Sequence, residues 1–347
     1  MPTRYESVKE ILRAKPSAWL VTGAAGFIGS NLAQALLQLG QSVVGLDNFA
    51  TGRRQNLDEM LAEAGPQAAT KFRFIEGDIA NPEICKTACS GVDYVLHQAA
   101  LPSVPRSMNN PLATHRANVD GFVNVILAAR DAKVRRFIFA SSSSVYGDSP
   151  VLPRVEDQIG RQLSPYAVSK YCNELYAGIV ARCFGLETIG LRYFNVFGRR
   201  QDPAGPYGGV IPKWISGLLA GTPCILNGDG QTSRDFCYVE NIVQANLLAA
   251  AAESSVASGQ IYNIGFGGNT TLNQLFEILR ESLAATRPEI RSAVLQMQPF
   301  RAGDVAHSTA DINKARRVFG YEPEYSLQRG LEKALPWYIA QHNSVQA

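Results

Sequence analysis

Tyr166 and Lys170 form a YxxxK pair, a combination of residue types that can transfer a proton. The pair stands on a predicted helix that begins near Pro165, so the two side chains, four residues apart, share one face. A tyrosine hydroxyl has a reference pKa of about 10, and it acts as a base near neutral pH only when a cation stabilises its phenolate. Because Lys170 can supply that cation, the spacing predicts general-base chemistry at Tyr166.

A run of serines, Ser141 to Ser144, lies at the end of the apolar stretch Arg135 to Ser142. That stretch predicts a buried strand, and ligands of open α/β sheets bind at the carboxyl ends of such strands. The Ser142 hydroxyl can therefore hydrogen-bond the substrate oxygen that Tyr166 deprotonates. Each motif alone has a simpler explanation, because YxxxK recurs by chance and a serine run is often a loop. Together the two motifs predict a catalytic site.

Glycines recur at Gly23, Gly26 and Gly29, directly after the first predicted strand and at the start of a helix. Glycines there allow a tight turn and let a pyrophosphate approach the helix N-terminus, whose free N–H groups and dipole favour an anion. The pattern GxxGxxG, with a strand before it and a helix after it, therefore predicts a dinucleotide site.

Asp47 closes the second predicted strand, 18 residues beyond Gly29. A carboxylate there can accept hydrogen bonds from the hydroxyls of an adenosine ribose, and it would repel a 2′-phosphate. The predicted cofactor is therefore NAD rather than NADP. The alternative is that Asp47 only caps a turn with Asn48. Asp78 and Ile79, at the end of the third predicted strand, are expected beside the adenine.

The scaffold of these residues is visible in the first half of the chain, where short apolar runs alternate with longer amphipathic stretches. The predicted strands are Ala18 to Gly23, Ser42 to Asp47, Phe72 to Asp78, Val92 to Ala100, Arg135 to Ser142 and Leu186 to Phe194. The predicted helices are Phe27 to Leu39, Leu112 to Arg130 and Tyr166 to Phe184. Near-continuous apolar strands separated by helices are typical of a parallel sheet covered on both faces. The predicted fold class is α/β, with a doubly wound parallel (Rossmann) sheet.

A second, smaller unit is expected after Asn195, where prolines and glycines between Gly198 and Gly209 indicate a loop that leaves the sheet. A helical segment, Ile242 to Ala252, and a strand, Gln260 to Ile264, then return to the sheet. At about 150 residues per domain, a chain of 347 residues also suggests two units. We predict a cofactor domain at 1–195 with 236–268, and a discontinuous α+β substrate domain at 196–235 with 269–347.

Composition narrows the class of protein. Hydrophobic residues make up 46% of the chain and charged residues 18%, which excludes a disordered, collagen-like or coiled-coil protein. The net charge of +3 gives no reason to expect a nucleic-acid or membrane partner. No apolar run reaches the roughly 18 residues of a membrane span. The stretch Met1 to Ser17 is too charged for a signal peptide, so a cytoplasmic location is expected.

The cysteines and histidines do not suggest a metal site. The chain has 6 cysteines without a CxxC pair or a histidine at zinc-like spacing, and they are expected to be reduced and mostly buried thiols. The 4 histidines are scattered, and each is expected to be a hydrogen-bonded or surface side chain.

With these motifs in place, the chain resembles the extended short-chain dehydrogenases/reductases that act on nucleotide sugars, and among them the UDP-N-acetylhexosamine 4-epimerases of surface-polysaccharide pathways. The resemblance extends from Trp19 to about Trp337. Its carriers are GAAGFIGSNL, GLDNFATG, EGDI, HQAA, SVPRS, SSSSVYGD, SPYAVSKY, LRYFNVFGRRQDP, VIPKWI, NGDGQTSRDFCYV and FRAGDVAHS. The helices Leu112 to Arg130 and Tyr166 to Phe184 can also pair across the four-helix bundle of a homodimer.

The resemblance implies a mechanism in which Tyr166 removes the 4-hydroxyl proton of a UDP-sugar while C4 passes a hydride to NAD. The 4-keto sugar then takes the hydride back on its other face. Ser142 would order or relay the proton, and Lys170 would also bind the nicotinamide ribose. Sister dehydratases place Asp-Glu after the catalytic hydroxyl and sister decarboxylases a Glu, whereas this chain has Ser143 and Ser144. Because serines cannot do that acid/base work, epimerisation is the reaction that remains. The resemblance implies that UDP-GlcNAc and UDP-GalNAc are the sugars interconverted.

The resemblance also implies which residues hold each ligand. The cofactor residues, besides Tyr166 and Lys170, would be Gly23, Gly26, Phe27, Ile28, Gly29, Asp47, Asn48, Thr51, Gly52, Asp78, Ile79, Gln98, Ala99, Ala100, Asn118, Tyr193 and Val196. The substrate residues, besides Tyr166, would be Ser103, Ser142, Ser143, Asn195, Gln201, Val210, Lys213, Asn227, Arg234, Arg301, Asp304 and Ser308. Two of them have simpler alternatives, because Arg234 could pair with Asp235 on the surface and Lys213 could be a solvated helix start.

Ser308 bears on the choice of sugar. Relatives restricted to unmodified hexoses carry tyrosine at the matching position, so the smaller Ser308 implies room for an N-acetyl group, unless Ser308 simply faces solvent.

Three alternatives to this function stay open. The substrate can be a UDP-N-acetylhexuronate or UDP-glucuronate, or the enzyme can be a C4-oxidising reductase on the same scaffold. The chain can also be a non-catalytic NAD-binding scaffold or sensor, although such proteins usually lose the base that Tyr166 represents.

Overall fold

The central sheet has 7 strands in the order β11-β6-β5-β4-β1-β2-β3, and every neighbouring pair is parallel. Its strands are β1 Ala18–Thr22, β2 Ser42–Asp47, β3 Phe72–Glu76, β4 Tyr94–His97, β5 Arg136–Ser142, β6 Glu187–Tyr193 and β11 Gln260–Ile264. From β1 the chain builds outward in one direction and from β4 in the other, which places a topological switch point between these two strands. The predicted doubly wound α/β fold is confirmed.

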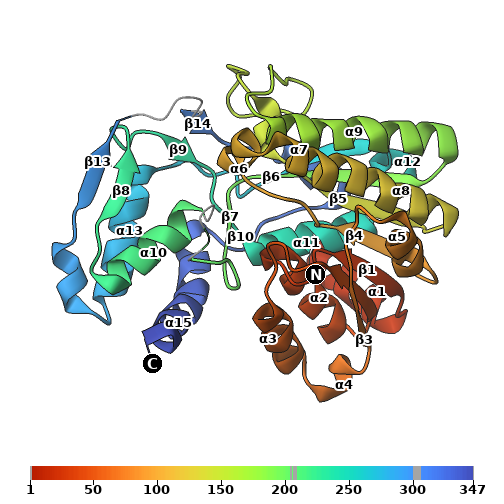
Figure 1. Ribbon diagram of the computed structural model, residues 1–347, viewed down its shortest axis with the longest axis horizontal. Coiled ribbons are helices and arrows are strands. Elements are labelled where there is room, and N and C mark those ends of the chain that lie inside the picture. Colours follow the sequence, from red (N-terminus) through yellow and green to blue (C-terminus); the bar gives the residue numbers. More distant parts are fainter. Residues whose placement is uncertain (1, 204, 206–208, 300–305, 347) are drawn as a thin grey trace.

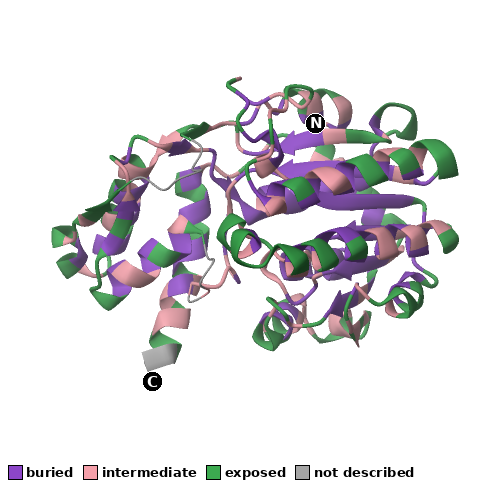
Figure 2. Ribbon diagram, turned by 45° about the horizontal axis from the view of Figure 1, so that its top comes forward, coloured by how far each residue is buried: buried purple, intermediate pink, exposed green. Residues whose placement is uncertain are grey.

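This structure is a computed structural model that describes residues 2–203, 205, 209–299 and 306–346. Helices cover both faces of the sheet (Figure 1). One face packs on α1 Arg4–Ala14, α2 Phe27–Gln38, α3 Arg54–Ala64 and α11 Val239–Ala250. The other face packs on α5 Pro82–Cys89, α8 Gly121–Asp131 and α9 Pro165–Phe184. Figure 2 shows the result, with the strands buried between two helical layers.

Two elements predicted from the sequence have different bounds in the structure, both near the switch point. The predicted strand Val92 to Ala100 is shorter, because Gln98 and Ala99 turn away after β4 and donate their N–H groups to the Thr22 hydroxyl at 3.2 Å. The predicted helix from Leu112 to Arg130 is divided into α7 Pro111–His115, the π-helical turn η1 Arg116–Asp120 and α8. Such π-turns insert one extra residue and are frequent at functional sites.

A smaller apolar core lies beside the sheet domain (left in Figure 1). It joins α10 Val210–Ala220, α13 Leu272–Ala284 and α15 Leu327–Gln346, with β8 Cys224–Asn227 paired in parallel to β13 Leu295–Gln298. Two further small sheets connect the cores: β7 Val196–Phe197 with β10 Cys237–Tyr238, and β12 Thr270–Thr271, β9 Ser233–Arg234 and β14 His307–Ser308.

The expected domain division follows these cores in outline, but part of the 269–347 segment packs on the sheet domain. Ala310, Ala315 and Phe319, in and before α14 Asn313–Phe319, are buried in the core of the central sheet. The boundaries therefore stay a prediction. The remaining helices are α4 Pro66–Ala69, α6 Val104–Asn109, α12 Ser254–Ala257, η2 Ser143–Tyr146 and η3 Pro288–Ser292.

All 6 cysteines are free, and Cys85, Cys89, Cys224 and Cys237 are buried, as the sequence predicts. In the part of the chain that the structure describes, no helix combines the length and the apolar character needed to cross a membrane.

Candidate active site

A cleft of about 620 Å³ opens where β1, β2, β4 and β5 end, at the switch point of the sheet. Residues at the end of each of these strands or directly after it line the cleft, among them Gly23, Asp47, Gln98 and Ser142. On the opposite side the lining comes from Tyr193 of β6, Val196 of β7 and the segment after β7, which includes Gln201. Ligands of doubly wound sheets bind at this position, so the cleft is the candidate active site.

The glycine-rich turn at one end of the cleft leaves no room for side chains. Gly23 has a φ of +70°, and a Cβ atom on it would lie 2.9 Å from the backbone nitrogen of Ala99. A Cβ atom on Gly29 would lie 2.0 Å from the carbonyl oxygen of Gly23. Gly26 begins α2 without a side-chain cap, so free N–H groups of the first turn face the cleft. The turn fits a dinucleotide pyrophosphate.

Asp47 is buried where β2 ends, and burial raises the pKa of its carboxyl group, partly offset by hydrogen bonds from backbone N–H groups. One carboxylate oxygen accepts from the Ala25 N–H at 2.9 Å, and the other accepts from the Phe49 N–H at 2.8 Å. Asp47 thus also caps the turn that follows β2, with hydrogen bonds from the Phe49 N–H and from the backbone of Asn48. The alternative that Asp47 only caps a turn with Asn48 stays open. Each oxygen can accept a further hydrogen bond, which leaves the expected ribose contact open.

The predicted cofactor residues gather along this cleft with one exception. Those that line it are Gly23, Gly26, Phe27, Ile28, Gly29, Asp47, Asn48, Thr51, Gly52, Asp78, Ile79, Gln98, Ala99, Ala100, Tyr166, Lys170, Tyr193 and Val196. The exception is Asn118, whose side chain is buried in the π-turn and bonds both the N–H (2.7 Å) and the carbonyl oxygen (3.2 Å) of Leu101. Asn118 therefore shapes the wall of the cleft from behind it.

Tyr166, Lys170 and Ser142 lie together in the same cleft. α9 carries Tyr166 and Lys170, and it begins at Pro165. The hydroxyl of the preceding Ser164 caps the helix by accepting from the Ala167 N–H. The Lys170 ammonium donates to the carbonyl oxygen of Ala140 at 2.9 Å, which ties the helix to the end of β5. The Ser142 hydroxyl accepts from the Ser144 N–H at 3.1 Å and hydrogen-bonds the Ser144 hydroxyl at 2.9 Å.

Burial controls the ionisation of Tyr166 and Lys170 on α9. Burial raises the pKa of the Tyr166 hydroxyl, while a hydrogen bond with Ser142 lowers that pKa. Burial also lowers the pKa of Lys170 to about 8, although the Glu174 carboxylate opposes that shift. The Tyr166 phenolate consequently needs a cationic Lys170, a hydroxyl donor and any positive charge that a ligand brings.

Comparison with known proteins identifies the family to which the chain belongs. The model of the NAD dependent epimerase/dehydratase family matches residues 19–265. The chain belongs to this family. The family recognised from the sequence is therefore confirmed, and NAD, the predicted cofactor, is the cofactor of the family.

Individual members of the family are similar over nearly the whole chain. A putative UDP-glucose 4-epimerase of Methanocaldococcus jannaschii is 36% identical over 92% of this chain and 97% of the relative. The structure of a UDP-N-acetylglucosamine 4-epimerase from Methanobrevibacter ruminantium, in complex with UDP-N-acetylmuramic acid, has 35% identity and a TM-score of 0.85 over 94% of this chain and 99% of the other. A UDP-glucuronic acid 4-epimerase from Bacillus cereus, with UDP-glucuronic acid and NAD, has 30% identity and a TM-score of 0.83 over 93% and 99%.

Behind the candidate catalytic residues lies a buried ion pair that the sequence analysis missed. Glu174, one helical turn beyond Lys170, forms a salt bridge of 2.7 Å with Arg192 of β6. The Ser141 hydroxyl donates to the same carboxylate at 2.5 Å. The pair thereby fixes α9 against the ends of β5 and β6. Its only sequence signal is the i, i+4 spacing of Glu174 from Lys170, which does not reveal the partner on β6.

The predicted substrate residues fall into three groups. Ser142, Tyr166 and Gln201 line the cleft. Ser103, Ser143, Asn195, Val210, Lys213, Asn227, Arg234 and Ser308 lie outside its lining, and Arg301 and Asp304 lie outside the described residues. Ser103 has a φ of +107° and caps α6, and Lys213 is exposed in the first turn of α10. These assignments stay predictions.

Arg234 and Ser308 are register partners on adjacent strands of the small sheet. The Arg234 guanidinium donates to the carbonyl oxygens of Ser233 (2.8 Å) and Ala306 (3.1 Å), while Asp235 is buried and accepts backbone N–H groups of Phe266 and Gly267. Arg234 thus contacts Ala306, the first residue that the structure describes after Pro299.

Proposed function

We propose that the protein is an NAD-dependent UDP-sugar 4-epimerase that works through a 4-keto intermediate. The observation that carries the proposal is the convergence of Tyr166, Lys170 and Ser142 in one cleft with the glycine-rich turn and Asp47. Family members with 35% and 30% identity over more than 90% of the chain are 4-epimerases of UDP-sugars. The names of these two relatives agree on the reaction, 4-epimerisation, and differ in the sugar.

Each catalytic side chain has a role that follows from its surroundings. Tyr166 takes the proton of the substrate 4-hydroxyl, and Ser142, in hydrogen-bond contact with Tyr166, orders that proton. Lys170, fixed to the Ala140 carbonyl oxygen, keeps a positive charge beside the phenolate. When bound, NAD supplies the acceptor and the donor of the hydride at C4. The mechanism needs no other acid, because the proton returns from Tyr166.

The residues after Ser142 support epimerisation over related reactions of the scaffold. Ser143 begins the short helix η2, and the Ser144 hydroxyl is engaged with Ser142. A dehydratase needs an acid for the 6-hydroxyl and a base for the C5 proton, and a serine hydroxyl is too weak for either.

For the substrate we propose the pair UDP-GlcNAc and UDP-GalNAc, made for surface-polysaccharide or O-antigen precursors, with UDP-N-acetylhexuronates and UDP-glucuronate as the alternative. Incubation with UDP-GlcNAc, UDP-Glc, UDP-GlcA and UDP-GlcNAcA, with products resolved by NMR, tests both choices. Conversion of UDP-GlcNAc to its 4-epimer at the highest kcat/KM supports the proposal. Faster conversion of an acidic sugar establishes the alternative. Bound NAD without turnover of any of the four sugars favours a non-catalytic scaffold or sensor.

We also propose that the protein is a homodimer. α9 exposes an apolar stripe at helical spacing, with Val168 48%, Leu175 54%, Tyr176 46% and Ile179 43% exposed. A stripe of this kind on a 20-residue helix fits the isologous interface of a two-fold dimer. Light scattering of the wild type and of Leu175→Arg tests it. A dimeric wild type and a monomeric variant are expected, and a monomeric wild type contradicts the proposal.

A further inference from the structure

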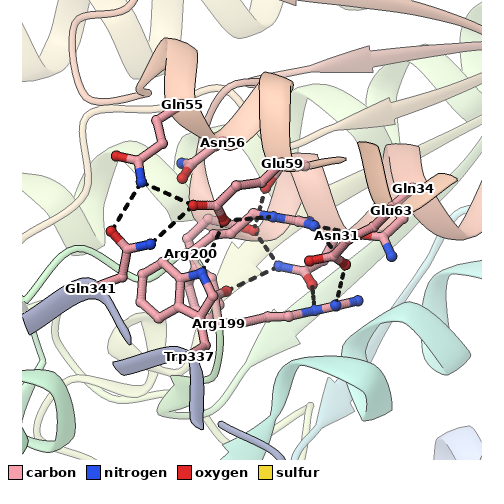
Figure 3. Close-up of polar contacts among 12 residues, drawn as sticks. Asn31, Gln34, Gln55, Asn56, Glu59, Glu63, Arg199, Arg200, Trp337 and Gln341 are labelled. Atoms are coloured by element: carbon pink, nitrogen blue, oxygen red, sulfur yellow. Dashed lines mark hydrogen bonds and ion pairs between the residues drawn. The ribbon is translucent and has the colours of Figure 1, made fainter. Parts of the chain in front are cut away.

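A cluster of charged side chains joins the segment after β7 to the two helices that border the cofactor end of the cleft (Figure 3). The segment, Gly198 to Asp202, is called here the arginine loop because Arg199 and Arg200 stand at its centre. Its last two residues, Gln201 and Asp202, line the cleft. What holds this loop therefore also sets the shape of the cleft.

Arg200 is the most constrained residue of the loop. Its side chain is 0% exposed, and its backbone has a φ of +66°, which is uncommon for a residue other than glycine. Its guanidinium lies 3.1 Å from Glu63 and 3.7 Å from Glu59, both on α3, and it donates to Gln34 on α2 at 2.5 Å. A buried charge in a strained backbone persists only where its surroundings fix it.

Arg199 ties the same loop to the first turns of α2. Its Nε donates to the Asn31 side-chain oxygen at 3.1 Å, and its carbonyl oxygen accepts from the Asn31 amide at 3.2 Å. The Asn31 amide also donates to Phe27, which lines the cleft at the glycine-rich turn. Arg199 shares the Glu63 carboxylate with Arg200. The loop is thus connected to the helix whose N-terminus is the pyrophosphate site.

The C-terminal helix α15 supports the loop from the other side. The Tyr338 hydroxyl lies 2.8 Å from the Gly198 carbonyl oxygen and 3.2 Å from the Gln201 side-chain oxygen. Trp337 donates to Glu59 at 2.9 Å, and Gln341 donates to it at 3.0 Å. Across the cleft, Asp202 pairs with Arg53, next to the Thr51 and Gly52 backbone.

From these contacts we infer that Arg200 is a positioning residue that clamps the arginine loop to α2 and α3, so that one rigid loop holds both NAD and the uridine nucleotide. Arg200 touches neither ligand, because it is fully buried behind the loop. It acts through Gln201 and Asp202, which face the cleft. Only the part of the inference that concerns the uridine nucleotide rests on the proposed function.

The test compares Arg200→Met with the wild type in two assays. The first measures the release of bound NAD by exchange against excess labelled NAD, and the second measures the Kd of UDP by calorimetry. Release at least about tenfold faster and a Kd at least about tenfold higher are expected, each equivalent to about 1.4 kcal/mol. Arg136→Met is the matched control, because Arg136 is also buried and ion-paired, with Glu187, but the carbonyl oxygens that it also binds, those of Ala249, Ala250 and Ala252, belong to no segment that lines the cleft.

Three outcomes overturn the inference. They are unchanged values in both assays, a change in only one of them, or an equal change in Arg136→Met. If Arg200→Met does not fold, Glu63→Gln replaces it, because the Glu63 carboxylate is 38% exposed and serves both arginines. NAD release requires no sugar turnover. A wild type that neither binds UDP nor epimerises a UDP-sugar therefore refutes the proposed function, and the NAD assay alone then decides whether Arg200 positions the loop for the cofactor.

Discussion

The Glu174 carboxylate and the Arg192 guanidinium meet at 2.7 Å with both side chains only 4% exposed, directly behind the end of β5, where Ser141 contacts the same carboxylate. Breaking such a buried pair leaves an uncompensated charge, which typically costs about 3–5 kcal/mol. We expect Glu174→Gln to lower the free energy of unfolding by about 3 kcal/mol or more, as measured by urea denaturation. Glu187→Gln is the control, because its salt bridge with Arg136 is partly open to solvent. Equal losses in the two variants would show that burial of the pair does not matter.

Tyr166→Phe removes the hydroxyl but keeps the ring in the wall of the cleft. Because the proposed base is lost, turnover of any UDP-sugar should fall below detection, while NAD stays bound. Activity is followed by NMR and bound NAD by chromatography of the denatured protein. Epimerisation near the wild-type rate would end the assignment of Tyr166 as the base.

The parts of the site that the sequence predicts are those in which a local motif coincides with the end of a strand or the start of a helix. Gly23, Ser142 and Tyr166 are of this kind, because the residues beside them already fix the turn, the strand or the helix that presents them. Their convergence follows from the parallel order of the sheet, which places the carboxyl ends of its strands at one edge.

Features that depend on contacts between distant segments escape sequence reasoning. Glu174 is on helix α9, but its partner Arg192 is on strand β6. The buried Arg200 pairs with Glu59 and Glu63 from a helix more than a hundred residues earlier in the sequence. For the same reason the sequence does not predict the π-turn around Asn118. Apolar periodicity continues through it, while the amide of Asn118 is drawn to Leu101 in the wall of the cleft.

Lys170 makes the stability of the protein depend on pH. Burial lowers its pKa from the ordinary value of 10.5 to about 8, so the unfolded chain binds more protons between these two values. Stability should therefore rise with pH across this window, by about 3 kcal/mol relative to Lys170→Met. Urea unfolding of both proteins, stripped of nucleotide, at pH 7.5 and 10.5 measures the difference. A difference that does not change with pH would contradict the lowered pKa.

Asp47 is expected to set the preference for NAD. Its carboxylate stands at the end of β2 beside Gly52, and it would repel a 2′-phosphate. Purified wild type should carry NAD, and Asp47→Ser should reduce the ratio of the NADP and NAD dissociation constants by at least about tenfold. Because Asp47 also holds the Ala25 and Phe49 N–H groups, both cofactors should bind the variant more weakly. Wild type loaded with NADP would refute this role.

Ser308 provides the test of the N-acetyl preference. It is half-buried on β14, in register with Arg234, and tyrosine there would add an aromatic ring to a packed position. Overpacking of this kind typically costs about 1–3 kcal/mol. If the ring fills the space that the N-acetyl group needs, Ser308→Tyr should lower kcat/KM for UDP-GlcNAc at least about tenfold, or about 1.4 kcal/mol, and keep activity on UDP-Glc. Ser308→Ala, which removes only the hydroxyl, should keep the wild-type preference. Equal losses on both sugars, or no loss on either, would exclude Ser308 from sugar selection, and the N-acetyl preference would then rest on family resemblance alone.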